Sequence, residues 1–145
     1  MAYVDLARSH VKECLREAFE LPTLSVDDDG DVPFAHGTAV YYVTVRSDGK
    51  RVKVWANAVV GVKRTAALQR EINEVNAGLE LARVYLVQDR LVIEGVLPVE
   101  PLLPADLRDL CLEVGITADE VGEMVSTVHG GVVARPDDSC DHCGA

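Results

Sequence analysis

The segment QREINEVNAGLELARVYLVQDRLVIEG, residues 69–95, changes from a helical pattern to a strand pattern within one stretch of chain. Apolar residues recur every three or four positions around its start, which predicts a helix over residues 63–81. The residues of this apolar stripe are Leu68, Ile72, Val75 and Leu79. Asn73 and Asn76 lie on an adjoining flank, although asparagine is a mediocre helix former. They allow three interpretations: a ligand site, polar structural contacts, or the solvent side of the helix.

The second half of this segment predicts a tight antiparallel hairpin around Gln88-Asp89. A two-residue loop places Arg83 opposite Glu94, where the two side chains suit a cross-strand ion pair. The other predicted pairs are Val84 with Ile93, Tyr85 with Val92 and Leu86 with Leu91.

Another hairpin is predicted within GTAVYYVTVRSDGKRVKVWANAVVGV, residues 37–62, because Asp48-Gly49 supplies a favoured two-residue turn. The turn fixes the register, so the two sides of the hairpin can be written out. One side is aliphatic and suits a core: Val45 with Val52, Val43 with Val54, and Tyr41 with Ala56. The other side combines an aromatic pair with polar and cationic residues: Tyr42 with Trp55, Thr44 with Lys53, and Arg46 with Arg51. This second side is either a surface that meets a partner, a dimer interface, or a strip covered by a helix.

Three further helices are expected, over residues 3–20, over residues 104–114, and from a capping box at Thr117 and Glu120 onward. Gly115 separates the last two helices in this prediction. Two short strands are expected on either side of an acidic turn at residues 27–31. That turn has the aspartates of a calcium loop, but it lacks the glutamate at the twelfth position and the flanking helices. We therefore interpret it as a solvated turn.

Short hairpins and flanking helices together predict an α+β domain, in which helices pack on one face of an antiparallel sheet. The formal net charge of −10 argues against nucleic-acid binding, which depends on neutralising phosphates. Apolar runs are too short for a membrane span, and the first residues form an amphipathic pattern rather than a signal peptide. A cytoplasmic location is expected. No motif with a catalytic mechanism occurs, so the protein is predicted not to be an enzyme.

The four cysteines divide into two groups. Cys14 and Cys111 lie in apolar helical stripes and are expected to be buried, reduced thiols. Cys140 and Cys143 form a CxxC pair in a C-terminal tail, residues 132–145, predicted to be flexible. This pair supplies only half of a tetrahedral zinc site, and it does not begin a helix as redox pairs do. A regulatory protein that responds to metal, zinc above all, or to redox state through this pair is the alternative to a simple binding module.

The sequence resembles the YbjN-like domains that are grouped with type III secretion chaperones as peptide-binding chaperones. The similarity covers residues 1–131, taken as one domain, and runs through DDDGDVPFAHGTAVYYVTV, KVWANAVVGV, LQREINEVNAGLELARVYLVQDRLVIEGVLPVEPL and ADEVGEMVSTVHGG. Its most specific parts are the Asn-x-x-Asn of the middle helix and the late AD … GG ending. The resemblance implies an antiparallel sheet with helices packed on it, often in a dimer. It implies that the protein holds a polypeptide segment without a cofactor and without turnover.

These observations predict a non-catalytic module that binds a peptide or protein client, as a homodimer, with no nucleic-acid or membrane partner. Aromatic rings would supply buried area, and cations would attract an acidic or C-terminal segment. The candidate contact residues are Tyr42, Trp55, Arg46, Arg51 and Lys53. Given the resemblance, Asn73 and Asn76 are predicted to make structural polar contacts, with neighbouring backbone or with a dimer mate.

Overall fold

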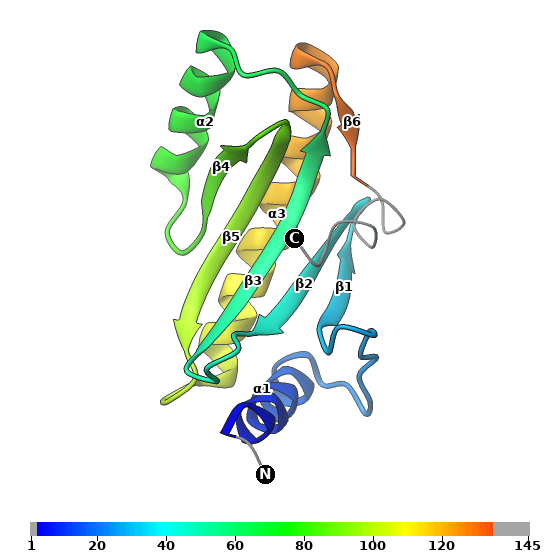
Figure 1. Cartoon of the computed structure of the whole chain (residues 1–145), viewed down its shortest axis with the longest axis vertical. Helices are drawn as coiled ribbons and strands as arrows, with labels where there is room; N and C mark the ends of the chain where they lie inside the picture. Colours follow the sequence, from blue (N-terminus) through cyan, green and yellow to red (C-terminus); the bar gives the residue numbers. More distant parts are fainter. Residues whose placement is uncertain (1–2, 135–145) are drawn as a thin grey trace.

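The structure, a computed structural model, describes residues 3–134. An antiparallel sheet with the strand order β1-β2-β3-β5-β4 is covered by helices, and the short β6 pairs with β3 (Figure 1). The elements are α1 (Tyr3–Phe19), β1 (Val32–His36), β2 (Ala39–Val45), β3 (Arg51–Val60), α2 (Ala66–Gly78), β4 (Arg83–Val87), β5 (Arg90–Pro98), α3 (Pro104–His129) and β6 (Val132–Val133). The α+β class and the packing of helices on one face are confirmed. None of the described helices has both the length and the apolar character that crossing a membrane requires.

Both predicted hairpin registers are confirmed where strand pairs are formed. In β2 and β3, Tyr42 is opposite Trp55 and Val43 is opposite Val54. In β4 and β5, Arg83 is opposite Glu94. Asp48-Gly49 makes the first turn, where Gly49 has a φ of 72°. The turns fix these registers because a shift of one residue would move every apolar side chain to the wrong face.

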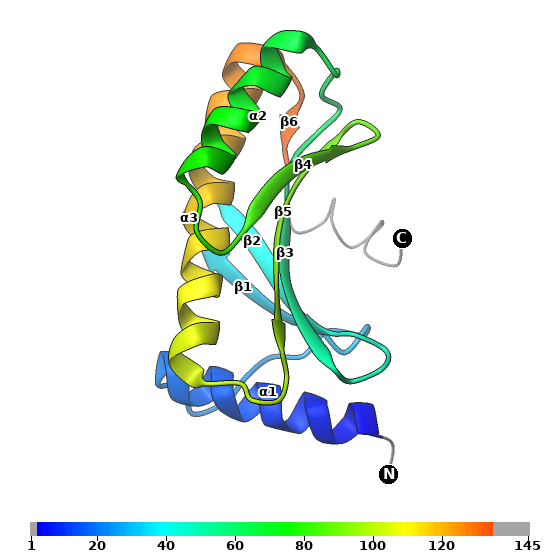
Figure 2. The same cartoon turned by 90° about the vertical axis from the view of Figure 1, so that its left-hand side faces the viewer.

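A single long helix, α3, crosses the concave face of the sheet and forms the centre of the core (Figures 1 and 2). The prediction of two helices separated by Gly115 is therefore wrong. Gly115 lies within α3, where an added Cβ would be 3.0 Å from the side chains of His36 and Tyr41. It is a point of close approach to the sheet rather than a stop. Thr117 is buried inside the helix and caps nothing.

Two other details of the sequence prediction differ from the structure. Residues 22–26 form no strand, so the chain reaches the sheet only at Val32. The sheet also continues past residue 131, where the sequence placed the start of the tail. β6 pairs Val133 with Val59, and the N–H of Ala134 donates to the carbonyl of Ala58 at 3.2 Å.

The close approach of α3 to the sheet depends on Gly95 of β5. A Cβ at this position would overlap Leu110 of α3 and come within 3.1 Å of the carbonyl oxygen of Leu81. We expect Gly95→Ala to lower the free energy of unfolding by about 1 to 3 kcal/mol, measured by chemical denaturation, because it overpacks this contact.

Gly78→Ala is the matched control, because a Cβ at Gly78 of α2 would meet nothing within 4 Å. That variant should leave the stability unchanged or raise it by up to about 1 kcal/mol, through better helix propensity. Equal stabilities of the two variants would contradict the close packing of α3 on β5.

Candidate functional site

The side of the sheet that faces away from α3, here called the outer sheet face, carries the candidate contact residues. Side chains alternate along a strand, so Val54 and Trp55 of β3 point to opposite faces. Val54 belongs to the core and is paired with Gly95, which touches α3. Trp55 therefore points to the outer sheet face. The described helices lie on the opposite side or at one end of the sheet (Figure 2), so none of them covers this face.

An aromatic stack occupies the middle of the outer sheet face. The ring centroids of Tyr42 and Trp55 are 4.9 Å apart, with 29° between the ring planes. The Trp55 indole N–H donates to the Thr44 hydroxyl at 2.9 Å, and Lys53 Nζ lies 5.4 Å from the centre of the indole. Trp55 is half-buried, whereas Tyr42 keeps an exposed fraction of only 5%. The stack is thus a rigid apolar centre with a cation beside it.

A buried carboxylate, Glu94 of β5, links the cations of this face. Lys53 Nζ is 3.2 Å from one carboxylate oxygen of Glu94, and Arg83 Nε donates to the other at 3.2 Å. Burial alone would raise the pKa of Glu94, but hydrogen bonds and charge from Arg83 and Lys53 outweigh it and lower the pKa. The Arg83 guanidinium also lies 5.1 Å from the centre of the Tyr85 ring. The carboxylate orients both cations, of which Arg83 keeps a side chain that is 70% exposed and Lys53 one that is 31% exposed.

The structure brings together only part of the set that the sequence singled out. Tyr42, Trp55 and Lys53 are in contact, whereas Arg46 and Arg51 are exposed beside the turn between β2 and β3. The sequence reasoning placed Thr44 on this side of the hairpin without a role, and it did not assign Arg83, Tyr85 and Glu94 to this surface. The missing signal was the pairing of β3 with β5, which places Trp55 opposite Glu94. These strands are separated by α2 and β4, so no turn residue marks their register.

The two asparagines of α2 have different surroundings. The Asn76 side chain donates to the carbonyl of Val84 at 2.9 Å and accepts from the N–H of the same residue at 2.7 Å. It therefore occupies the position that a neighbouring strand would take along the edge strand β4. The side chain of Asn73 is exposed.

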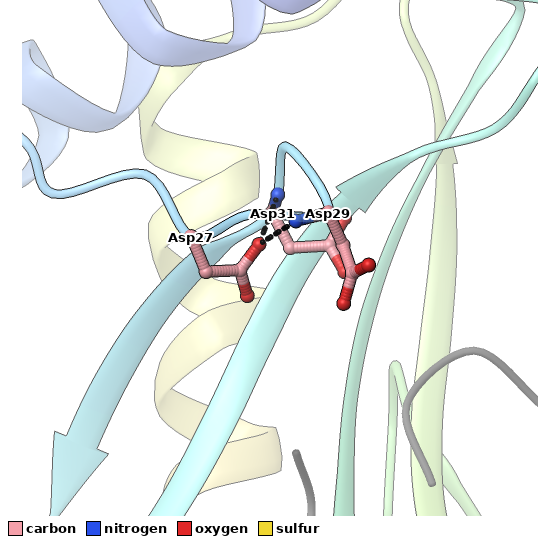
Figure 3. A group of neighbouring side chains, drawn as sticks. All are labelled: Asp27, Asp29 and Asp31. Carbon is pink, nitrogen blue, oxygen red and sulfur yellow. Dashed lines mark hydrogen bonds between the residues drawn. The ribbon is translucent and has the colours of Figure 1, made fainter. Parts of the chain in front are cut away.

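The acidic turn brings the carboxylates of Asp27, Asp29 and Asp31 within 4.8 Å of one another (Figure 3). One oxygen of Asp27 accepts the backbone N–H groups of Asp29 at 3.0 Å and Asp31 at 2.9 Å. Asp31 is buried, which raises its pKa, with the neighbouring aspartates adding to the effect and a Thr44 hydrogen bond opposing it. These hydrogen bonds explain the acidic residues structurally: they form a turn that the side chain of Asp27 closes.

Cys14 and Cys111 are free and buried, as predicted. Burial raises the pKa of the Cys111 thiol to about 12, so this cysteine stays protonated and unreactive at neutral pH. Cys140 and Cys143, the predicted CxxC pair, lie outside the described residues.

Residues 5–137 match the family described as T3SS (YopN, CesT) and YbjN peptide-binding chaperone 1. The chain belongs to this family. The match covers nearly the whole chain, which confirms the resemblance found in the sequence. It also extends beyond residue 131 and includes β6. Among proteins of curated function, none is significantly similar to this family member in sequence.

Several solved structures share the fold of this family member. The Yersinia pestis type III secretion chaperone SycH, in complex with a fragment of YscM2, superposes with a TM-score of 0.60 at 14% identity, covering 77% of this chain and 96% of that one. A chain of the ExsC–ExsE complex gives a TM-score of 0.60 at 14% identity, covering 86% of this chain and 96% of that one. A chain of the HopA1–SchA chaperone–effector complex gives a TM-score of 0.60 at 15% identity, covering 81% of this chain and 97% of that one. At these identities the similarity shows a common fold.

Removal of the Asn76 side chain should weaken the edge of the sheet. We expect Asn76→Ala to cost about 1 to 2 kcal/mol of stability, because the backbone groups of Val84 lose two hydrogen bonds. The exchange of the Val84 amide hydrogen should accelerate accordingly. Asn73→Ala, on the same helix but exposed, should stay within about 0.5 kcal/mol of the parent. Unchanged exchange at Val84 in the Asn76 variant would argue against this bridge.

The ion pairs of Glu94 should make stability depend on pH. The folded pKa of Glu94 lies below its ordinary value of 4.5, so the ionised form stabilises the fold above that pH and the contribution is lost as pH falls through the folded value. We expect Glu94→Gln to be less stable by about 1 to 3 kcal/mol at pH 7. The difference from the parent should shrink in denaturation series below pH 4.5. A difference that is constant across this range would show that the ion pairs contribute nothing.

Proposed function

We propose that this protein is a non-catalytic peptide-binding chaperone that captures an extended, acidic segment of a client protein on its outer sheet face. It acts without a cofactor and without chemical turnover. The observation that carries the proposal is the aromatic stack of Tyr42 and Trp55 among oriented cations, in a chain of this chaperone family.

The physical chemistry of the outer sheet face supports this choice of client. The chain as a whole has a net charge of −10, yet the side chains that alternation directs to this face from β3, β4 and β5 include four cations and one carboxylate. The acidic turn, whose Asp31 forms a hydrogen bond with Thr44, lies at the β1–β2 side of the same face. The four cations are Arg51, Lys53, Arg83 and Arg90, and the carboxylate is Glu94. Trp and Arg are the residue types on which interface energies concentrate. An acidic segment is attracted by the cations, and apolar side chains within it gain by covering Trp55.

The proposal includes a cytoplasmic homodimer. The backbone groups of Val84 point away from β5 towards Asn76, so those of Leu86, two residues further along β4, point away from β5 as well. An edge of this kind can pair with a second chain. Light scattering in solution should give twice the mass of one chain, whereas the mass of a single chain at micromolar concentration would remove the dimer from the proposal.

Affinity capture tests the client-binding face. Immobilised full-length protein should retain client proteins from the native cell extract, identified by mass spectrometry. We expect Trp55→Ala to reduce that capture at least about tenfold, because an aromatic residue at the centre of an interface contributes roughly 2 kcal/mol or more. Trp55→Phe keeps a ring on Tyr42 and should restore most of the capture.

The matched control is Val128→Ala, which removes an exposed apolar side chain near the end of α3. Each variant is first shown to unfold cooperatively, so that loss of capture reports on the surface. Capture of the same proteins at the same level by the parent and by Trp55→Ala would overturn the assignment of this face.

A further inference from the structure

We propose that the open edge of β5 at Val96 captures the C-terminal end of a client chain, whose terminal carboxylate binds the Val96 N–H and the Arg83 guanidinium. The open edge does not depend on the proposed function, and only the choice of a client as its occupant rests on it.

β5 is longer than β4, so the last part of its edge has no neighbouring strand (Figure 1). β4 begins at Arg83, which pairs with Glu94, whereas β5 continues to Pro98. If β4 extended backwards in the same register, Leu81 would lie opposite Val96. The described residues form no such pair.

A carboxylate of α3 holds the segment before β4 away from this edge. Glu113 accepts hydrogen bonds from the N–H groups of three consecutive residues: Glu80 at 3.0 Å, Leu81 at 2.7 Å and Ala82 at 2.6 Å. These donors are therefore turned towards α3 instead of β5. A cavity of about 340 Å³, lined by residues 80–83 and 94–96, is left beside the strand, and its size is within the range of ligand sites.

The backbone groups of Val96 point into this gap. On the other side of β5, the N–H of Val99 donates to the carbonyl of Lys50 at 3.0 Å, next to the end of β3. Backbone groups alternate between the two sides of a strand, so those of Leu97 and Gly95 also face β3, whereas those of Val96 face away from it. Within residues 3–134, the N–H and C=O of Val96 have no hydrogen-bond partner on that side.

The direction of β4 determines which part of a client chain fits. A strand that pairs with Val96 antiparallel to β5 runs in the same direction as β4, and it meets the start of β4 at Arg83. The client chain therefore ends opposite Val96. One oxygen of its terminal carboxylate accepts the N–H of Val96, and the other is directed towards Arg83, about 7 Å further along. Pro98 has no N–H, so the pairing is limited to roughly the last three residues of the client.

Arg83 keeps hydrogen-bond donors for this carboxylate. Its Nε and Nη2 atoms bind Glu94, whereas its Nη1 group takes no part in that contact and the side chain is 70% exposed. Around the cavity, the charges of Lys53 and Arg83 cancel those of Glu80 and Glu94. The carboxylate is therefore selected by charge-assisted hydrogen bonds and by the position of the chain end, and not by net charge.

The acidic turn lies further from this edge. Asp31 forms a hydrogen bond with Thr44 of β2, which pairs with Lys53 of β3, and Lys53 in turn pairs with Val96. Two strand spacings, roughly 10 Å, and the ammonium group of Lys53 thus separate the turn from the edge. At physiological ionic strength, repulsion over that distance is largely screened.

Hydrogen exchange tests the open edge without a client. Relative to its intrinsic rate, the amide hydrogen of Val96 should exchange at least about a hundredfold faster than those of Gly95 and Leu97, because only the latter two bond to β3. Equal protection at low protein concentration would overturn the proposal, since another part of this chain would then occupy the edge. Protection that appears only at high concentration would overturn it in favour of a second copy.

A defined peptide tests the occupant. Isotope-labelled full-length protein is titrated, with detection by NMR, with the peptide acetyl-Thr-Val-Thr-Val-Val as the free acid and as the C-terminal amide. The free acid should shift the amide resonance of Val96 and bind at least about tenfold more tightly than the amide, which lacks the charge. Absence of a shift at millimolar peptide, or equal binding of the two peptides, would overturn the proposal.

Arg83→Gln tests the role of the guanidinium. This variant should bind the two peptides equally, within about twofold, while slow exchange at Gly95 shows that the sheet is intact. The control is Arg64→Gln, which removes an exposed cation just before α2 and should keep the full preference for the acid. A preference that survives Arg83→Gln would overturn the assignment of the carboxylate to Arg83.

Affinity capture separates this inference from the proposed function. Clients that depend on Trp55 but are retained equally by the parent and by Arg83→Gln would leave the proposed function standing and overturn the capture of a chain end. Selective binding of the free-acid peptide at Val96, with no client retained by any form, would support the edge site while the proposed function fails.

Discussion

The close approach of α3 to the sheet is the constraint on which the rest of the structure depends. Gly95, Gly115 and Gly122 remove side chains at three points where the helix and the sheet meet. The helix can therefore lie against the strands along most of its length, and Leu107, Leu110 and Val114 become fully buried. A larger residue at any of these glycines would lift the helix from the sheet and open the core.

The position of α3 also makes the two faces of the sheet different in packing and in residue type. The inner face is aliphatic and holds the domain together. The outer face does not pack against α3, so it can carry Trp55, Lys53 and Arg83 in partly exposed positions. Glu94 is the buried link between them, and its two ion pairs fix the cations in a definite arrangement. A surface prepared in this way loses less conformational entropy on binding than one made of free lysines and arginines.

The features that the sequence predicted correctly are those that residues close together in the chain determine. Asp48-Gly49 fixed the register of β2 and β3, and the loop at Gln88-Asp89 fixed that of β4 and β5, because a tight turn determines its own pairing. What failed depended on contacts between distant segments. Gly115 looked like a helix end because local propensity cannot show that Tyr41 lies against it. β6 has only two residues, too few for a periodic pattern, and its partner lies more than 70 positions earlier. The Trp55–Glu94 pairing was missed for the same reason, and with it half of the candidate site.

The order of elements along the chain has a consequence for synthesis. The helix that covers the sheet is made after every strand of the main sheet, since α3 begins at Pro104 and β5 ends at Pro98. At roughly 5 to 20 residues per second, the 26 residues of α3 take between about one and five seconds to emerge. During that interval the aliphatic side of the new strands has no cover of its own. A member of a peptide-binding chaperone family thus passes through a stage in which its own sheet needs shielding.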